Sequence, residues 1–148
     1  MNDHKVFFRG NRGFSLIELM ITVSILIILV AIAVPNYRSH VLRSQRSDAM
    51  SALLRVAAEQ EKFYMQNNTY TGTLGTGGLN IKPTSQNGHY KLSVSGADQQ
   101  GFVAEAVPNT APDEDIEDSL CVFFSFDQQG QKYAHDSGDA DTTTSCWR

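Results

Sequence analysis

The stretch RGFSLIELMITVSILIILVAIAVPNY, residues 12–37, decides how this sequence is organised. Its 21 residues from Phe14 to Val34 include a single charged side chain, that of Glu18. A helix of that length spans about 31 Å, close to the thickness of the hydrocarbon core of a bilayer. A charged residue at the centre of such a helix costs about 2.5–3.5 kcal/mol. We therefore expect residues 14–34 to form a membrane-spanning helix in which Glu18 needs a compensating partner.

The helix is predicted to continue as an amphipathic segment over residues 35–67. Pro35 marks the junction, and we expect it to kink or loosen the helix because proline has no backbone N–H to donate. Gln60 is a polar interruption in the apolar stripe of this segment. The other members of the stripe are Leu42, Ala49, Leu53, Val56, Ala57 and Tyr64.

Residues 68–148 are predicted to form a small globular head. A loop rich in Asn, Thr and Gly comes first. Runs of alternating apolar and polar residues then predict strands within 89–96 and 101–108, and the apolar run 120–126 predicts another. A turn at Gly130 leads to a short partner strand, and the last residues, 136–148, show no periodicity. The predicted fold class is α+β, with the long helix packed on three or four antiparallel strands.

Cys121 and Cys146 are the two cysteines of the chain. They are too few for a structural zinc site, so we expect a disulfide, the alternative being two separate buried thiols. A disulfide implies an oxidising compartment. Closing a loop of this length stabilises the fold by about 3.5 kcal/mol in the chain-entropy model.

The charge of the predicted head argues against several functions. Residues 68–148 carry four basic and eleven acidic side chains, a net charge of −7, which repels nucleic acid. A DNA-binding role would require Lys82, Lys91 and Lys132 to cluster. The acidic run 113–118 offers carboxylates for Ca²⁺ but lacks EF-hand spacing, so no metal or other cofactor is expected. The sequence contains no catalytic constellation and predicts a non-enzyme.

A secretory signal peptide is the simplest alternative interpretation of the amino-terminal region. The apolar run is longer than the 7–15 residues of an ordinary signal, and no small-x-small cleavage motif follows it. Instead, residues 9–37 resemble the type IV pilin signature: a short basic leader that ends in Gly13, then Phe14, Glu18 in an apolar helix, and Pro35 near its end. The segments KFYMQNNTYTG and SCWR are similar to those of minor pilins.

The resemblance implies a role for each of these residues. Residues 1–13 would be a leader that a membrane-embedded prepilin peptidase removes by cutting between Gly13 and Phe14. The same enzyme would methylate the new amine of Phe14. Glu18 would then pair with an amino-terminal amine in the filament core. The family fold also implies a long helix on a small sheet, with a carboxy-terminal loop closed by Cys121 and Cys146.

The implied partners are other pilin subunits, the peptidase, the inner-membrane assembly machinery and, before assembly, membrane lipid. The head is expected in the periplasm and later on the cell-surface pilus. As a minor pilin, the chain would support pilus assembly or initiation, and through it twitching motility, adhesion or DNA uptake. The alternatives are a pseudopilin of a type II secretion system and a DNA-binding competence pilin. Arg43 and Arg46 either contact acidic heads of neighbouring subunits or lie on a solvated helix face.

Overall fold

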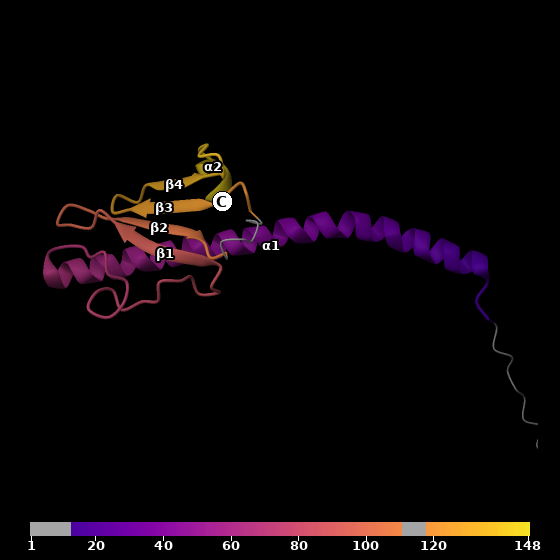
Figure 1. The fold of residues 1–148 in the computed structure, drawn as a ribbon, viewed down its shortest axis with the longest axis horizontal. Coiled ribbons are helices and arrows are strands. Elements are labelled where there is room, and N and C mark those ends of the chain that lie inside the picture. The colour runs from indigo at the N-terminus through magenta and orange to yellow at the C-terminus, as the bar shows by residue number, and fades with distance from the viewer. Residues whose placement is uncertain (1–12, 111–117) are drawn as a thin grey trace, which may run out of the picture. The chain divides into compact units, whose positions relative to one another are not determined.

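The computed structural model of the 148-residue chain describes residues 13–110 and 118–148 (Figure 1). The predicted leader, apart from Gly13, lies outside these residues, and so does the acidic run 113–118, apart from Asp118. The chain divides into two compact units, Met1–Arg38 and Ser39–Arg148. The second unit contains the head, whose architecture follows.

One helix, α1, runs from Leu16 to Asn67 and joins the two predicted helical segments. It begins two residues after Phe14, and its first turn includes a bond from the Leu19 N–H to the Ser15 carbonyl at 3.1 Å. Pro35 lies inside α1 without ending it. The missing N–H of Pro35 removes one helical hydrogen bond. The predicted kink at this residue stays a prediction.

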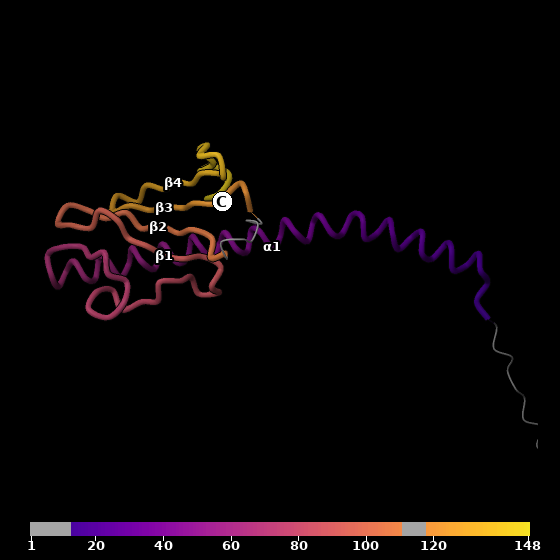
Figure 2. Tube along the Cα trace, viewed as in Figure 1, coloured from indigo at the N-terminus to yellow at the C-terminus, as the bar shows by residue number. Residues whose placement is uncertain are grey.

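The head contains a four-stranded antiparallel sheet whose strands follow one another in chain order (Figure 2). This arrangement confirms the predicted α+β fold. Of the three or four strands predicted, the sheet has four. The alternating runs within 89–96 and 101–108 mark two of the strands correctly, because burial alternates along both of them. The strands are β1 (Tyr90–Ser95), β2 (Val103–Pro108), β3 (Phe123–Asp127) and β4 (Lys132–His135).

The core lies between the head portion of α1 and one face of the sheet. Three of the predicted stripe residues, Ala49, Leu53 and Val56, are fully buried. Small side chains on the sheet help to accommodate the helix, since the inward residues of β2 and β4 are all alanines. Burial raises the pKa of the Tyr90 phenol to about 12. The buried residues of the sheet face are Tyr90, Leu92, Ala104, Ala106, Phe124 and Ala134.

Gln60, the polar interruption in the predicted stripe, is completely buried. Its amide nitrogen donates to the Thr71 carbonyl at 2.6 Å, and its amide oxygen accepts from the Thr71 N–H at 3.0 Å. One side chain thus pairs with both backbone groups of a partly buried loop residue, and its own buried amide is satisfied. Gln60 therefore ties the loop after α1 back onto the helix.

Asp48 is a second buried polar group on α1, and the sequence does not predict its role. Its carboxylate accepts a hydrogen bond from the Ser85 hydroxyl at 2.6 Å and another from the Asn87 N–H at 3.2 Å. The Ser85 hydroxyl in turn accepts from the Tyr90 N–H at 3.0 Å. This chain of bonds connects the helix to the segment that leads into β1, because a buried carboxylate must find donors.

Gly78 allows the loop between α1 and β1 to turn tightly. A methyl group at this position would overlap the Thr73 carbonyl. That carbonyl accepts the Leu79 N–H at 2.9 Å, and the side chain of Leu79 is buried in the core. Glycine at residue 78 thus lets an otherwise polar loop deliver an apolar side chain to the core.

Arg46 forms a two-pronged ion pair with Asp118 of the same chain. Its Nε lies 2.6 Å from Oδ2 and its Nη2 lies 2.9 Å from Oδ1. Both side chains are largely shielded from solvent, with 16% exposure for Arg46 and 6% for Asp118. The hydrogen bond to Asp118 raises the pKa of Arg46. The sequence left two interpretations of Arg46, a solvated residue or a contact to a neighbouring subunit. Both are wrong, because Arg46 pairs with Asp118, which lies 72 residues away in the same head.

We predict that Arg46→Met lowers the free energy of unfolding by about 3 kcal/mol, because it leaves a buried carboxylate without its partner. Adding Asp118→Leu should restore most of the loss, since a buried pair is often replaced by apolar side chains at little cost. Urea denaturation of the full chain in detergent, followed by tryptophan fluorescence, measures both effects.

Lys62→Met is the matched control. It removes an exposed pair with Glu59, whose nitrogen and oxygen are 3.2 Å apart. Exposed pairs contribute little, so we expect a change below about 0.5 kcal/mol. Equal losses for Arg46→Met and Lys62→Met would contradict a structural role for the Arg46–Asp118 pair.

Candidate functional site

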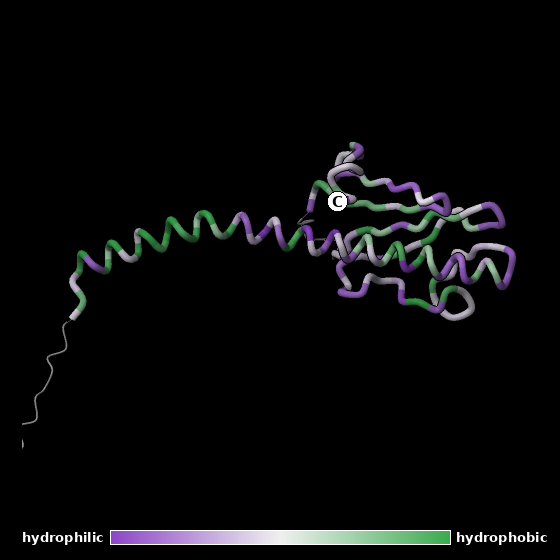
Figure 3. Tube along the Cα trace, turned by 180° about the vertical axis from the view of Figure 1, so that it is seen from behind, coloured by the Kyte–Doolittle hydropathy of each residue, from purple (hydrophilic) through white to green (hydrophobic). Residues whose placement is uncertain are grey.

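The first half of α1 consists mostly of hydrophobic residues (Figure 3). Between Phe14 and Val34, every large apolar side chain is at least 47% exposed, and Phe14 itself is 82% exposed. This part of α1 is long and apolar enough to cross a membrane, and none of it is buried within the chain. Because apolar residues lie all round the helix, it cannot be covered by packing on one side.

Burying the apolar side chains of this segment releases more free energy than burying its one carboxylate costs. Full burial of a large aliphatic side chain is favourable by about 1.5–3 kcal/mol. The half-exposed residues of this segment together represent on the order of 20 kcal/mol, whereas an intramembrane carboxylate costs about 3 kcal/mol. The cost of the Glu18 charge is therefore smaller than the free energy that burial of the apolar segment would supply.

Glu18 lies in the first turn of α1, and its side chain is exposed. The other polar side chains of the segment that follow it are satisfied within the helix: the Thr22 hydroxyl donates to the Leu19 carbonyl at 2.8 Å, and the Ser24 hydroxyl donates to the Met20 carbonyl at 2.7 Å. The Glu18 carboxylate is thus the one formal charge on an otherwise apolar helix surface between residues 14 and 34.

Gly13 and Phe14, the residues of the predicted cleavage site, precede α1 in non-helical backbone. Both residues are exposed, and among the described residues a Cβ atom built at Gly13 would meet no atom within 4 Å. Three residues separate Phe14 from Glu18 along the chain. Of the sequence-predicted residues, Gly13 and Phe14 thus come just before α1, and Glu18 lies in its first turn.

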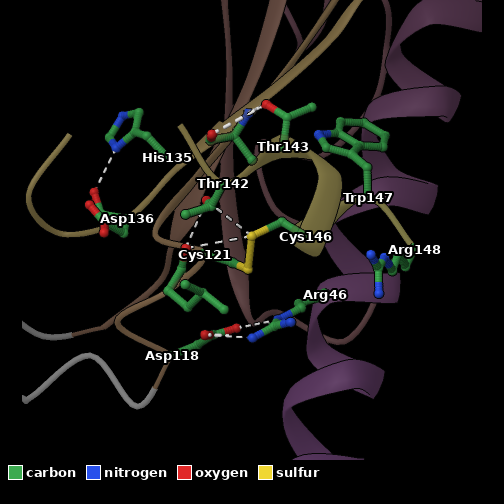
Figure 4. Close-up of a disulfide and its surroundings, with 12 residues drawn as sticks. Arg46, Asp118, Cys121, His135, Asp136, Thr142, Thr143, Cys146, Trp147 and Arg148 are labelled. Carbon is green, nitrogen blue, oxygen red and sulfur yellow. Dashed lines mark hydrogen bonds and ion pairs between the residues drawn. A yellow bond between two sulfur atoms is a disulfide. The ribbon is translucent and has the colours of Figure 1, made fainter. Parts of the chain in front are cut away.

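The disulfide edge of the head, which we define as residues 118–121 and 142–148, contains the predicted Cys121–Cys146 bond (Figure 4). The two Cα atoms are 5.9 Å apart, and both cysteines are buried. Cys146 ends α2 (Thr143–Cys146), a one-turn helix that the sequence does not reveal because four residues are too few to show a period. The bond ties the carboxy-terminal segment to the residues before β3.

Non-covalent contacts also hold the carboxy-terminal segment on the sheet. The Thr143 hydroxyl accepts from the Ala134 N–H at 2.9 Å, and the Thr142 hydroxyl donates to the Leu120 carbonyl at 2.9 Å. The Trp147 indole N–H donates to the Tyr133 carbonyl at 3.1 Å. A hydrogen bond from Thr143 lowers the pKa of Asp141. The disulfide is therefore one of several attachments.

No group of three or more His, Cys, Asp or Glu side chains that could hold a metal ion occurs among residues 13–110 and 118–148. Most carboxylates of the acidic run 113–118, where no metal is expected, lie outside that range. Asp118, the member that is described, is bound to Arg46 instead.

The class of protein follows from three features: a long amino-terminal helix whose apolar first half carries one charge, a four-stranded antiparallel meander, and a carboxy-terminal disulfide. Together they define a type IV pilin. Comparison with protein families agrees with this class. Residues 8–34 match the prokaryotic N-terminal methylation motif, and residues 35–125 match the family described as type IV minor pilin ComP, DNA uptake sequence receptor. The second match covers more than half of the chain, which therefore belongs to this family of type IV minor pilins.

Several curated relatives are similar over parts of their length. The fimbrial protein EcpC of Eikenella corrodens is 33% identical over 101 residues, 67% of this chain and 64% of EcpC. The type IV major pilin protein PilA of Myxococcus xanthus is 44% identical over 61 residues, 41% of this chain and 28% of PilA. The type II secretion system core protein G of Dickeya chrysanthemi is 31% identical over 52% of this chain and 51% of its own. The chain thus spans less than two thirds of these relatives.

A solved structure supports the fold. The non-core minor pilin PilV of Neisseria meningitidis superposes with a TM-score of 0.51 over 69% of this chain and 94% of PilV, at 22% sequence identity. At that identity the similarity concerns the fold alone.

We predict that replacing both cysteines, Cys121→Ala with Cys146→Ala, lowers the free energy of unfolding by about 3 kcal/mol, because the open chain gains entropy when unfolded. Denaturation of the full chain in detergent measures the loss. A reducing agent should have the same effect on the unaltered chain and none on the variant.

The contacts of Thr142, Thr143 and Trp147 should keep part of the carboxy-terminal segment in place after reduction. Hydrogen exchange of the α2 amides should therefore accelerate while exchange in β2 stays slow. An unchanged denaturation midpoint after reduction would contradict the predicted contribution of the bond.

Proposed function

We propose that this minor pilin is a structural subunit that enters a bacterial type IV pilus through its amino-terminal helix and supports pilus assembly or initiation. The observation that carries the proposal is the segment from Phe14 to Val34, an exposed apolar surface with one carboxylate. Through the pilus, the subunit contributes to twitching motility, adhesion or DNA uptake. Pilins are structural proteins, and this chain is proposed to act without catalysis or a cofactor.

Processing creates the partner that Glu18 needs. In the full chain the nitrogen of Phe14 is an uncharged amide. Cleavage between Gly13 and Phe14 by a prepilin peptidase converts it into an ammonium group, and methylation by the same enzyme keeps the charge. A well-formed pair of opposite charges offsets the cost of removing each from water. The proposed order is therefore insertion first, then cleavage, then assembly.

A pair between Glu18 and the amine of a neighbouring subunit would set the axial position of one helix on another. Apolar contacts alone do not choose a register along helices that are apolar on all sides, because sliding replaces one such contact with another. A single buried polar pair adds an energetic penalty to every wrong register. This is the function we assign to Glu18.

The proposed location follows from the same helix and from the disulfide. Before assembly, residues 14–34 cross the inner membrane once, surrounded by lipid, with the head in the periplasm, where a disulfide is stable. After assembly, other pilin subunits replace the lipid and the head lies on the cell-surface pilus. The inner-membrane assembly machinery is the proposed partner in this transfer.

We predict that Glu18→Ala leaves membrane insertion and cleavage intact but reduces the amount of the subunit in sheared pili at least tenfold, because the register-setting charge is lost. Immunoblots of membrane and pilus fractions measure both quantities. Glu61→Ala, which removes an exposed carboxylate near the other end of α1, is the matched control and should assemble normally. Normal incorporation of Glu18→Ala would contradict the proposed role.

Mass spectrometry of the subunit from purified pili should find an amino terminus at Phe14 that carries one methyl group. This result is expected because the proposal makes cleavage the source of the cation. An intact Met1, or cleavage after Val34 as in a secretory signal, would contradict the proposal.

A pseudopilin function is a second candidate, favoured by the similarity to core protein G of a type II secretion system. The disulfide edge argues for the pilin, because here a covalent bond holds the carboxy-terminal segment to the head. Recovery of the chain in secretion-system filaments and not in pili would reverse this preference.

DNA binding is a third candidate, because the matched family is described as a DNA uptake sequence receptor. The charge of the head opposes it. Lys91 and Lys132 lie on β1 and β4, the opposite edge strands of the sheet, and Lys132 sits 5.2 Å from the centre of the Trp147 ring. The three lysines therefore do not gather into one basic patch.

A gel-shift assay with the full chain in detergent tests this candidate. We expect no retarded duplex at moderate salt, since non-specific binding depends on phosphate neutralisation and weakens steeply as salt increases. A complex that survives moderate salt and prefers one sequence would establish the receptor role instead.

A further inference from the structure

A basic recess lies where the head portion of α1 meets the disulfide edge. Its volume is about 520 Å³, and three of its six lining residues are arginines. Figure 4 shows Arg46 below the disulfide and Arg148 to its right. The lining residues are Arg43, Arg46, Ser47, Ser145, Cys146 and Arg148.

The recess is positively charged although the head as a whole is acidic. No acidic side chain lines it among the described residues. Arg46 is neutralised by Asp118, which leaves Arg43 and Arg148 as exposed cations. Arg148 is held in place by a hydrogen bond from its Nε to the Thr144 carbonyl at 2.9 Å, so its other guanidinium nitrogens can bind an anion.

The position of the recess along the chain indicates which anion is available. Arg43 follows Val34, the last residue of the apolar run, by nine residues, or about 14 Å of helix. If residues 14–34 span the bilayer, Arg43 follows the span closely along the chain, and phospholipid headgroups are the anions present at that boundary. Long arginine side chains can reach back towards that layer while their aliphatic parts stay on the protein.

We propose that the recess binds the phosphate of an anionic phospholipid while the subunit resides in the membrane. This inference rests on the proposed membrane insertion of residues 14–34. A guanidinium group can donate two parallel hydrogen bonds to a phosphate, which gives it geometric selectivity that a diffuse positive potential lacks. The exposed hydroxyl of Ser145 adds a further donor at the rim.

Bound lipid would orient the head before assembly. The bonds to a headgroup would hold the disulfide edge against the membrane surface. Extraction into a filament must break this contact, so the recess would favour the membrane-resident form by about 1 kcal/mol for each arginine that binds the anionic surface, roughly a fivefold effect on affinity.

The full chain in a non-ionic, phosphate-free detergent provides the test. The chain has one tryptophan, Trp147, between the recess residues Cys146 and Arg148, and its fluorescence can report occupancy. Titration with short-chain phosphatidylglycerol should give a saturable change, and Arg43→Gln should weaken the apparent affinity about fivefold. Arg55→Gln removes an exposed arginine of the same helix outside the recess and should leave the affinity unchanged.

The remaining measurements test whether the recess prefers an anionic lipid to other anions. Inorganic phosphate should bind at least tenfold more weakly than phosphatidylglycerol; equal affinity would overturn the assignment to lipid. Displacement of phosphatidylglycerol by duplex DNA or by an acidic peptide at lower concentration would also overturn it. If Arg43→Gln and the unaltered chain bound phosphatidylglycerol with the same affinity, the proposal that the recess is the binding site would be wrong.

Resistance of the chain to carbonate extraction from membranes tests the proposed function separately. A chain that is extracted by carbonate contradicts the proposed insertion. A chain that is retained but whose fluorescence does not respond to phosphatidylglycerol contradicts the lipid site alone.

Discussion

The apolar surface between Phe14 and Val34 must be covered, and the properties of this protein depend on that requirement. In water the surface represents a cost on the order of 20 kcal/mol, more than the net stability of a typical domain. In the proposed function, two environments remove that cost: lipid before assembly and other helices afterwards. Because both are apolar, we propose that the exchange between them is close to balanced in free energy and that the charge of Glu18 influences it.

The second half of α1 buries its apolar residues in a different way from the first half. Ala49, Leu53 and Val56 pack into the head, so this half is stabilised by its own chain and not by neighbours. Polar side chains on the same face, Asp48 and Gln60, bind backbone and hydroxyl groups of the following loop. A buried polar group without a partner costs several kcal/mol, so these bonds discriminate against misplaced packing as well as stabilising the correct one.

The elements with strong local patterns could be predicted from the sequence. The apolar run, the strand alternation near Leu92 and Ala104, the apolar strand near Phe124, and the two cysteines each carry a signal that depends on a few neighbouring residues or on their number alone. For the candidate site, the positions of Gly13, Phe14 and Glu18 follow from sequence spacing, because these residues are close along the chain. The single turn α2 was missed, since it is too short to have a period.

The sequence by itself determined the class of fold, the order of the strands and the segment that must leave water, because each depends on local periodicity or composition. Only the tertiary structure decided which polar residues are partners. Asp118 meets Arg46 across 72 residues, Ser85 meets Asp48 across 37, and Arg43 and Arg148 come to line one recess. No local pattern encodes such pairs, because they exist only after the hydrophobic core has folded the sheet against α1 and brought distant segments together.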